Sequence, residues 1–88
     1  MIVKALKKEW DVNDCSYKDR RELHKLNTQV WWKGDMDVDA YYVLLEKVSD
    51  ISGLGEDDFK ELGMVEVDQV LQAVFTSYLG LEKKASGD

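Results

Sequence analysis

The clearest structural signal in the chain is Val67-Asp-Gln-Val70-Leu71-Gln-Ala-Val74-Phe75-Thr-Ser-Tyr78. Its apolar residues recur at positions i, i+3, i+4, i+7, i+8 and i+11, which is the spacing of one face of an α-helix. Gly80 follows this run and predicts the end of the helix. We therefore expect a long helix here, with its apolar face at the centre of the core.

Two further helices are predicted before this one. The first begins at Ser16, which opens a sequence of the capping-box form, and it ends near Gly34. The second begins at Asp37 and ends at the Gly53-Leu-Gly55 break, and residues 56–62 have the composition of one short helical turn. The apolar positions at helical spacing in the two helices are Leu23, Leu26, Val30, Val38, Tyr41, Tyr42, Leu45, Val48 and Ile51.

The first twelve residues are compatible with two structures. Ile2, Leu6 and Trp10 recur every four residues, as in a helix, but together with Val12 they also share one face of a strand. The turn-rich residues that follow favour an extended segment over residues 1–13. A strand needs a partner for its backbone groups, and this is either the second strand of a hairpin or another chain.

Length and composition allow one small domain. The chain has 88 residues, of which 44% are hydrophobic and 34% are charged, so one modest core can form. We predict a mainly α fold over residues 1–81: a small bundle of three main helices plus a short one, with an extended N-terminal segment. We predict a flexible tail at residues 82–88, because this segment has little to bury.

Several functional classes have no support in the sequence. No apolar run approaches the roughly 18 residues of a membrane span, no secretory signal is visible, and the single cysteine, Cys15, favours the cytoplasm. Cys15 and His24 lack the further ligands that zinc requires, and the oxyanion hole and orienting group that nucleophilic catalysis requires. A glycine-rich phosphate loop is also missing. We therefore predict a non-enzymatic protein without catalytic, metal-binding or cofactor-binding residues.

One acidic motif resembles a calcium-binding loop. Asp35, Asp37 and Asp39 alternate, and Glu46 stands at the twelfth position. Position six is Ala40, however, where the loop requires glycine because a left-handed conformation costs other residues about 1–2 kcal/mol. The alternative is that Asp37 caps a helix and Asp39 lies in its first turn. We favour capping and expect calcium to leave the stability unchanged.

The net charge of −6 is unevenly distributed. Residues 1–33 carry eight Lys and Arg against five Asp and Glu, whereas residues 34–88 carry four against thirteen. The acidic part disfavours nucleic acid as a partner, and the asymmetry favours protein partners or copies of the chain packed head to tail. The alternative is that both parts are solvated helix faces. Three residues, Lys18, Arg21 and Lys25, form a basic stripe on the first predicted helix.

Trp31 and Trp32 pose a question of burial. Neighbouring positions on a helix diverge by about 100°, so both side chains cannot face the same core. We expect one tryptophan to lie in the core and the other to be exposed as an interface anchor, or folded over the turn at Gly34. The alternative is that both pack within the domain.

The order of the segments resembles the small tail assembly chaperones of long-tailed bacteriophages. The resemblance covers residues 16–32, 40–55 and 64–81, with the motifs Leu-His-Lys-Leu, Tyr-Tyr-x-Leu-Leu, Gly-Leu-Gly and Val-Asp-Gln-Val-Leu-Gln-Ala-Val-Phe. It implies an assembly factor in the cytoplasm, which is the host cytoplasm if a phage encodes it. Such a factor self-associates and binds the tape-measure protein, keeping it soluble while tail-tube proteins polymerise around it. The candidate partner-binding residues are Trp31, Trp32, Lys18, Arg21 and Lys25.

Two other interpretations remain open. A generic small acidic helical adaptor or regulator would share the composition and the helix order. An acyl-carrier-like bundle would suit the length and the acidity, but that fold attaches its prosthetic arm to a serine in an Asp-Ser-Leu motif. The corresponding region here reads Met64-Val-Glu66 and lacks the serine.

Overall fold

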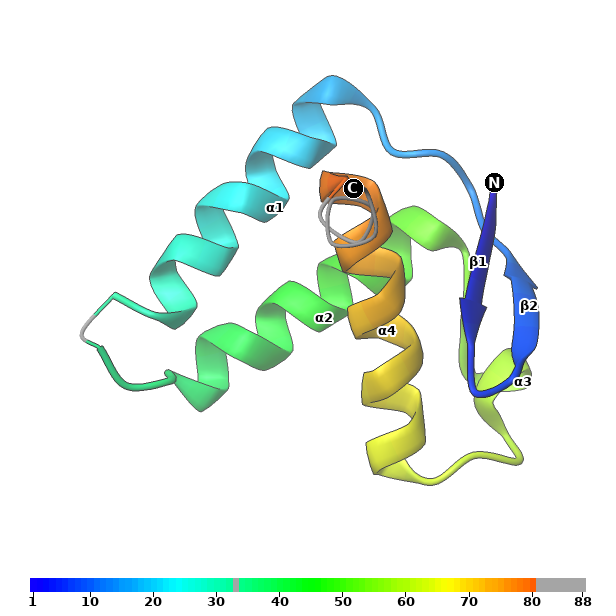
Figure 1. The fold of residues 1–88 in the computed structure, drawn as a ribbon. Helices are drawn as coiled ribbons and strands as arrows, with labels where there is room; N and C mark the ends of the chain where they lie inside the picture. The colour runs from blue at the N-terminus through cyan, green and yellow to red at the C-terminus, as the bar shows by residue number, and fades with distance from the viewer. Residues whose placement is uncertain (33, 81–88) are drawn as a thin grey trace, which may run out of the picture.

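The computed structural model describes residues 1–32 and 34–80. Its elements are the strands β1 (Ile2–Ala5) and β2 (Lys8–Asp11) and the helices α1 (Tyr17–Val30), α2 (Val38–Ser52), α3 (Glu56–Phe59) and α4 (Met64–Leu79) (Figure 1). The predicted mainly α fold, with three main helices, a short one and an extended N-terminal segment, is confirmed. The tail predicted at residues 82–88 lies outside the described residues.

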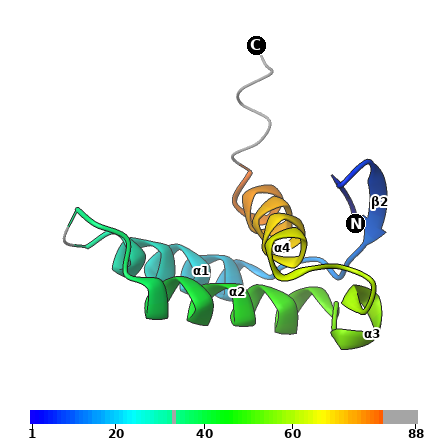
Figure 2. The same ribbon diagram turned by 90° about the horizontal axis from the view of Figure 1, so that it is seen from below.

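The helices form two layers (Figure 2). α1 and α2 lie side by side as an antiparallel helical hairpin, and α4 crosses one face of this hairpin. β1 packs against α4, on the side of α4 away from the connection between α1 and α2, and β2 pairs with β1. As a result, the end of the helical hairpin that carries this connection extends beyond α4 (Figure 2).

The core lies between the two layers and is centred on α4. Val70 and Val74 have no exposed surface, as the helical spacing of the last segment predicted, whereas Val67 and Phe75 from the same face are only partly buried. The other buried apolar residues are Val3, Trp10, Val12, Cys15, Leu23, Val30, Leu44, Leu45, Val48, Leu54, Leu71 and Tyr78.

Polar side chains cap the N-termini of α1 and α2. The Ser16 hydroxyl accepts a hydrogen bond of 3.1 Å from the Asp19 amide at the start of α1. The Asp37 carboxylate accepts one of 3.1 Å from the Ala40 amide at the start of α2. The predicted capping role of Asp37 is therefore confirmed. Gly53 ends α2 with φ of 85°, in the left-handed region that favours glycine.

The extended N-terminal segment is an antiparallel hairpin, so its partner strand lies within the chain. Val3 and Trp10 face each other across the hairpin and are both buried, whereas Ile2 is exposed. Grouping Ile2 with Trp10 on one face was therefore wrong. Each cross-strand pair joins an odd-numbered residue to an even-numbered one, as Val3 and Trp10 show. Residues on one face of the β-hairpin are therefore odd-numbered in one strand and even-numbered in the other.

The turn of this hairpin is strained at two residues. Leu6 and Lys7 have φ values of 54° and 62°, which a type I′ turn requires and which Asn and Gly adopt more readily. Because Lys7 is exposed, Lys7→Gly should raise the free energy of unfolding by about 1 kcal/mol. The matched variant Lys4→Gly, in β1, should lower it, since glycine weakens a strand. Urea unfolding measures both, and a Lys7→Gly protein no more stable than wild type would contradict the strain.

Candidate protein-binding surface

Two adjacent exposed tryptophans follow the end of α1. Trp31 is the C-cap residue and Trp32 comes next, and 55% and 75% of their surfaces are exposed. The expectation that one of them lies in the core is wrong. The last side chain of α1 that reaches the core is Val30, and the connection to α2 that begins after it extends beyond the region that α4 covers (Figure 2).

Backbone hydrogen bonds hold the chain on both sides of the tryptophan pair. The Asp37 amide donates to the Val30 carbonyl at 2.8 Å, and the Gly34 amide donates to the Trp31 carbonyl at 3.1 Å. Gly34 has φ of 86°, in the region that favours glycine. These bonds fix the backbone on both sides of the two rings, which reduces the backbone entropy that a binding event must remove.

Each tryptophan borders a different hollow. Trp31 lines a groove of about 490 Å³ between the helical hairpin and α4, together with Met36 and Phe75. Trp32 lines a second groove of about 880 Å³, together with Met36 and Lys25. We call Trp31, Trp32 and Met36 the tip surface. Its apolar side chains line two grooves, and Met36 lines both of them.

The basic stripe runs along α1 and joins this surface. Lys18, Arg21 and Lys25 are exposed, as their helical spacing predicted, and they line a hollow of about 820 Å³. Lys25 also lines the groove of Trp32, so the stripe and Trp32 form one continuous face. Of the predicted partner-binding residues, the basic stripe and Trp32 therefore share one face, whereas Trp31 lines the other groove.

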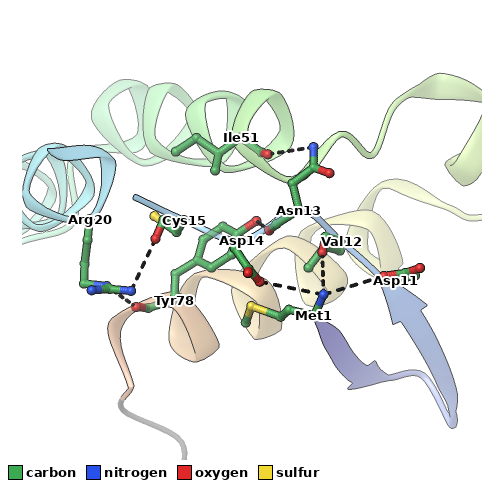
Figure 3. A network of polar contacts seen from close by, with 9 residues as sticks. All are labelled: Met1, Asp11, Val12, Asn13, Asp14, Cys15, Arg20, Ile51 and Tyr78. Atoms are coloured by element: carbon green, nitrogen blue, oxygen red, sulfur yellow. Dashed lines mark hydrogen bonds and ion pairs between the residues drawn. The ribbon is translucent and has the colours of Figure 1, made fainter. Parts of the chain in front are cut away.

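Arg20 stands next to Arg21 in the sequence, but it has a structural role and is not part of the basic stripe. Its guanidinium donates to the carbonyls of Tyr78, at 2.8 Å, and Cys15, at 3.3 Å (Figure 3). The Tyr78 hydroxyl donates to the Asn13 carbonyl at 2.5 Å. This network ties α1 and α4 to the connection that precedes α1, and so fixes the helix that carries the basic stripe.

Tyr78 makes the stability depend on pH in the alkaline range. Burial first, and then the charges of Cys15, Asp14 and Asp19, raise the pKa of Tyr78 from 10.0 to about 12. The folded protein holds this proton more tightly than the unfolded chain, so the stabilisation is present below pH 10 and is lost as the pH rises to about 12. In Tyr78→Phe, the loss over this range should be smaller by on the order of 2 kcal/mol. Urea unfolding at several pH values tests this, and equal losses in both proteins would contradict it.

A second exposed apolar pair, which sequence analysis did not single out, begins α4. Met64 and Val65 are each 70% exposed. Acidic residues lie on both sides of the pair along the chain. The exposure of Val65 could have been predicted, because Val65 lies off the apolar face that Val67 begins. Met64 stands three residues before Val67 and seven before Leu71, so helical spacing alone places it on that face.

The described residues give little support for a metal site or a catalytic centre. Within residues 1–32 and 34–80, no group of three or more His, Cys, Asp or Glu side chains could hold a metal ion. Burial raises the pKa of the Cys15 thiol, which disfavours the reactive thiolate, and His24 is exposed on α1. In the same described part of the chain, none of the helices has the length and apolar character needed to cross a membrane.

No protein-family model matches the chain, and none of the curated proteins or solved structures is significantly similar to it. The resemblance to tail assembly chaperones therefore rests on the sequence segments and motifs alone.

Proposed function

We propose that the protein is a non-enzymatic phage tail assembly chaperone that self-associates and binds the tape-measure protein. The observation that carries the proposal is the exposure of both Trp31 and Trp32 on one end of the helical hairpin. Exposed tryptophan lowers solubility, and tryptophan is enriched among the residues that dominate binding energy at interfaces. The resemblance of the helical segments to this class of chaperone supplies the identity of the partner.

The groove beside Trp31 suits a helical partner with an apolar stripe. Its lining side chains come from both helices of the hairpin, from the connection between them and from α4, and they include Met36, Tyr41, Leu44 and Phe75. An amphipathic helix binds such a groove through side chains one helical turn apart. A tape-measure protein is a long helical chain with apolar stripes, so many copies of this protein could bind along it.

The charge of the protein accounts for the effect on solubility. Each bound copy adds a net charge of −6 to the complex, and a coat of like-charged molecules resists association between complexes. The basic stripe is a local exception to this charge. It lies beside Trp32 and would steer acidic segments of a partner toward the tip surface.

Co-expression with the tape-measure protein encoded nearby tests this function. We expect the tape-measure protein to be insoluble when expressed alone, and to be soluble and co-purify with this chain when the two are expressed together. If this chain neither keeps the tape-measure protein soluble nor co-purifies with it, the chaperone function is refuted and a generic acidic adaptor or regulator replaces it.

A further inference from the structure

A small acidic hollow lies between α2, α3 and the start of α4. Its charged lining residues are all carboxylates, and its apolar lining comes from all three helices: Glu46, Glu56 and Asp68, with Leu45, Phe59, Val67 and Leu71. Among the described residues, no Lys or Arg lines this hollow, and we call it the acidic hollow. Its volume is about 240 Å³, below the roughly 300–1,000 Å³ of small-molecule sites, so it suits one inserted side chain.

The hollow along the basic stripe has the opposite charge, and we call it the basic hollow. Its charged lining residues are four cations and one carboxylate: Lys18, Arg20, Arg21, Lys25 and Glu22. Tyr17 lines it too, and 69% of the Tyr17 surface is exposed. The Arg21 guanidinium lies 5.8 Å from the centre of the Tyr17 ring and donates a hydrogen bond of 3.4 Å to its hydroxyl. The basic hollow thus presents an exposed aromatic ring with a cation beside it.

We infer that a second copy of this chain inserts its Tyr17 into the acidic hollow. Its Lys18 and Arg21 then meet Glu46 and Glu56, and the ring meets the apolar lining. An aromatic anchor that fills a pocket, with opposite charges around it, is the usual construction of a specific protein interface. This inference rests on the self-association that the proposed function includes, but not on the identity of the partner.

The chain itself supplies both halves of this interface. The cations of the basic hollow belong to residues 1–33, where Lys and Arg outnumber Asp and Glu by eight to five. The carboxylates of the acidic hollow belong to residues 34–88, where Asp and Glu outnumber Lys and Arg by thirteen to four. The charge asymmetry of the sequence therefore becomes, in the fold, two separate surfaces of opposite sign. This complementarity favours a second copy as the occupant.

The contact has to form between copies, because the two hollows lie at opposite ends of α4. Leu79 at the end of α4 lines the basic hollow, whereas Asp68 near its start lines the acidic one. Asp68 precedes Leu79 by 11 residues, which is about 16 Å along a helix axis. The end of α4 lies by α1, and its start lies on the side of α2 away from α1 (Figure 1). Contact between two different surfaces of identical chains is heterologous, and it generates an open chain or a closed ring.

Such an assembly uses lining residues other than those of the Trp31 groove. The Trp31 groove shares only the buried Leu45 with the acidic hollow, and it shares no lining residue with the basic hollow. Every copy in a chain or ring would therefore keep its Trp31 groove for the tape-measure protein.

Contacts within the molecule determine which charges can be reversed in a test. Arg20 holds the carbonyls of Tyr78 and Cys15, and Asp68 accepts a hydrogen bond of 3.1 Å from the Tyr42 hydroxyl, so both stay unchanged. Lys25 also stays unchanged, because it lines the Trp32 groove as well. The exposed residues that remain are Lys18 and Arg21 in the basic hollow and Glu46 and Glu56 in the acidic one.

The test is sedimentation velocity at several protein and salt concentrations. We expect wild type to assemble reversibly, and added salt to weaken the assembly. Lys18→Glu/Arg21→Glu and Glu46→Lys/Glu56→Lys should each stay monomeric alone at concentrations where wild type assembles. An equimolar mixture of the two variants should assemble again, because every contact then joins opposite charges. Lys4→Glu/Lys7→Glu, which has the same net charge as the basic-hollow variant but lines neither hollow, should assemble like wild type.

Single aromatic variants complete the test. Tyr17→Ala should weaken assembly at least tenfold in affinity. Trp31→Ala removes an exposed aromatic ring that lines neither hollow, so it should assemble like wild type. Circular dichroism should confirm that every variant is folded.

The outcomes separate this inference from the proposed function. A monomeric wild type, a mixture that stays monomeric, or full assembly by Tyr17→Ala would overturn the inference. Assembly by either reversed variant alone would overturn it while leaving self-association intact. Normal assembly without binding to the tape-measure protein would refute the proposed partner and leave this interface standing.

Discussion

Replacing Val74 with Asp should lower the free energy of unfolding by about 3 kcal/mol or more, or prevent folding altogether. Val74 has no exposed surface and lies on the face of α4 that forms the centre of the core. A carboxylate at this position loses its hydration and is surrounded by apolar side chains. Because small domains are stable by only about 5–15 kcal/mol, the loss should be evident in urea unfolding followed by circular dichroism.

Gln69→Asp is the matched control for this substitution. Gln69 is exposed on the same helix, so a carboxylate there should change the free energy of unfolding by only about 0.5 kcal/mol or less. Phe75 shares the apolar spacing of Val74, but Phe75→Ala should cost less than Val74→Asp because Phe75 is only partly buried. A loss below about 1 kcal/mol for Val74→Asp would mean that this face of α4 is not the core.

Truncating both exposed tryptophans should abolish most of the partner binding. Trp31→Ala/Trp32→Ala should weaken the affinity for a purified tape-measure segment by about 2 kcal/mol or more, which is roughly 30-fold. The stability should change little, since both rings are exposed. Isothermal titration calorimetry and urea unfolding give the two quantities.

Val43→Ala is the control for this experiment. Val43 is 51% exposed on α2 and does not line either tip groove, so its truncation should leave the affinity unchanged. If the double tryptophan variant binds as tightly as Val43→Ala, the tip surface is not the site of binding.

Local signals predicted most of the fold. Ser16 and Asp37 cap their helices through contacts with residues three positions away, so the sequence alone contains the information. The N-terminal hairpin was harder to predict, because its turn is Leu6-Lys7, without the Asn or Gly that usually marks a two-residue turn. The extended conformation could be predicted there, but the pairing of the strands could not.

The candidate site depended more on tertiary structure. The basic stripe followed from the spacing of three residues on one helix. The sequence predicted that one of Trp31 and Trp32 is exposed, but not that both are, because this depends on where α4 crosses the helical hairpin (Figure 2). Similarly, Arg20 and Arg21 look equivalent in the sequence, and only the contact of Arg20 with Tyr78, 58 residues away, separates them.

Tryptophan fluorescence tests the proposed role of the tip surface. The chain has three tryptophans; Trp10 is buried, whereas Trp31 and Trp32 are exposed. Adding a purified tape-measure segment should shift the emission of wild type to the blue, because the exposed rings leave water. In Trp31→Phe/Trp32→Phe, where only Trp10 emits, the same addition should produce no shift. If wild-type emission stays at the position of the free protein when the segment is saturating, the exposed tryptophans do not form the binding surface.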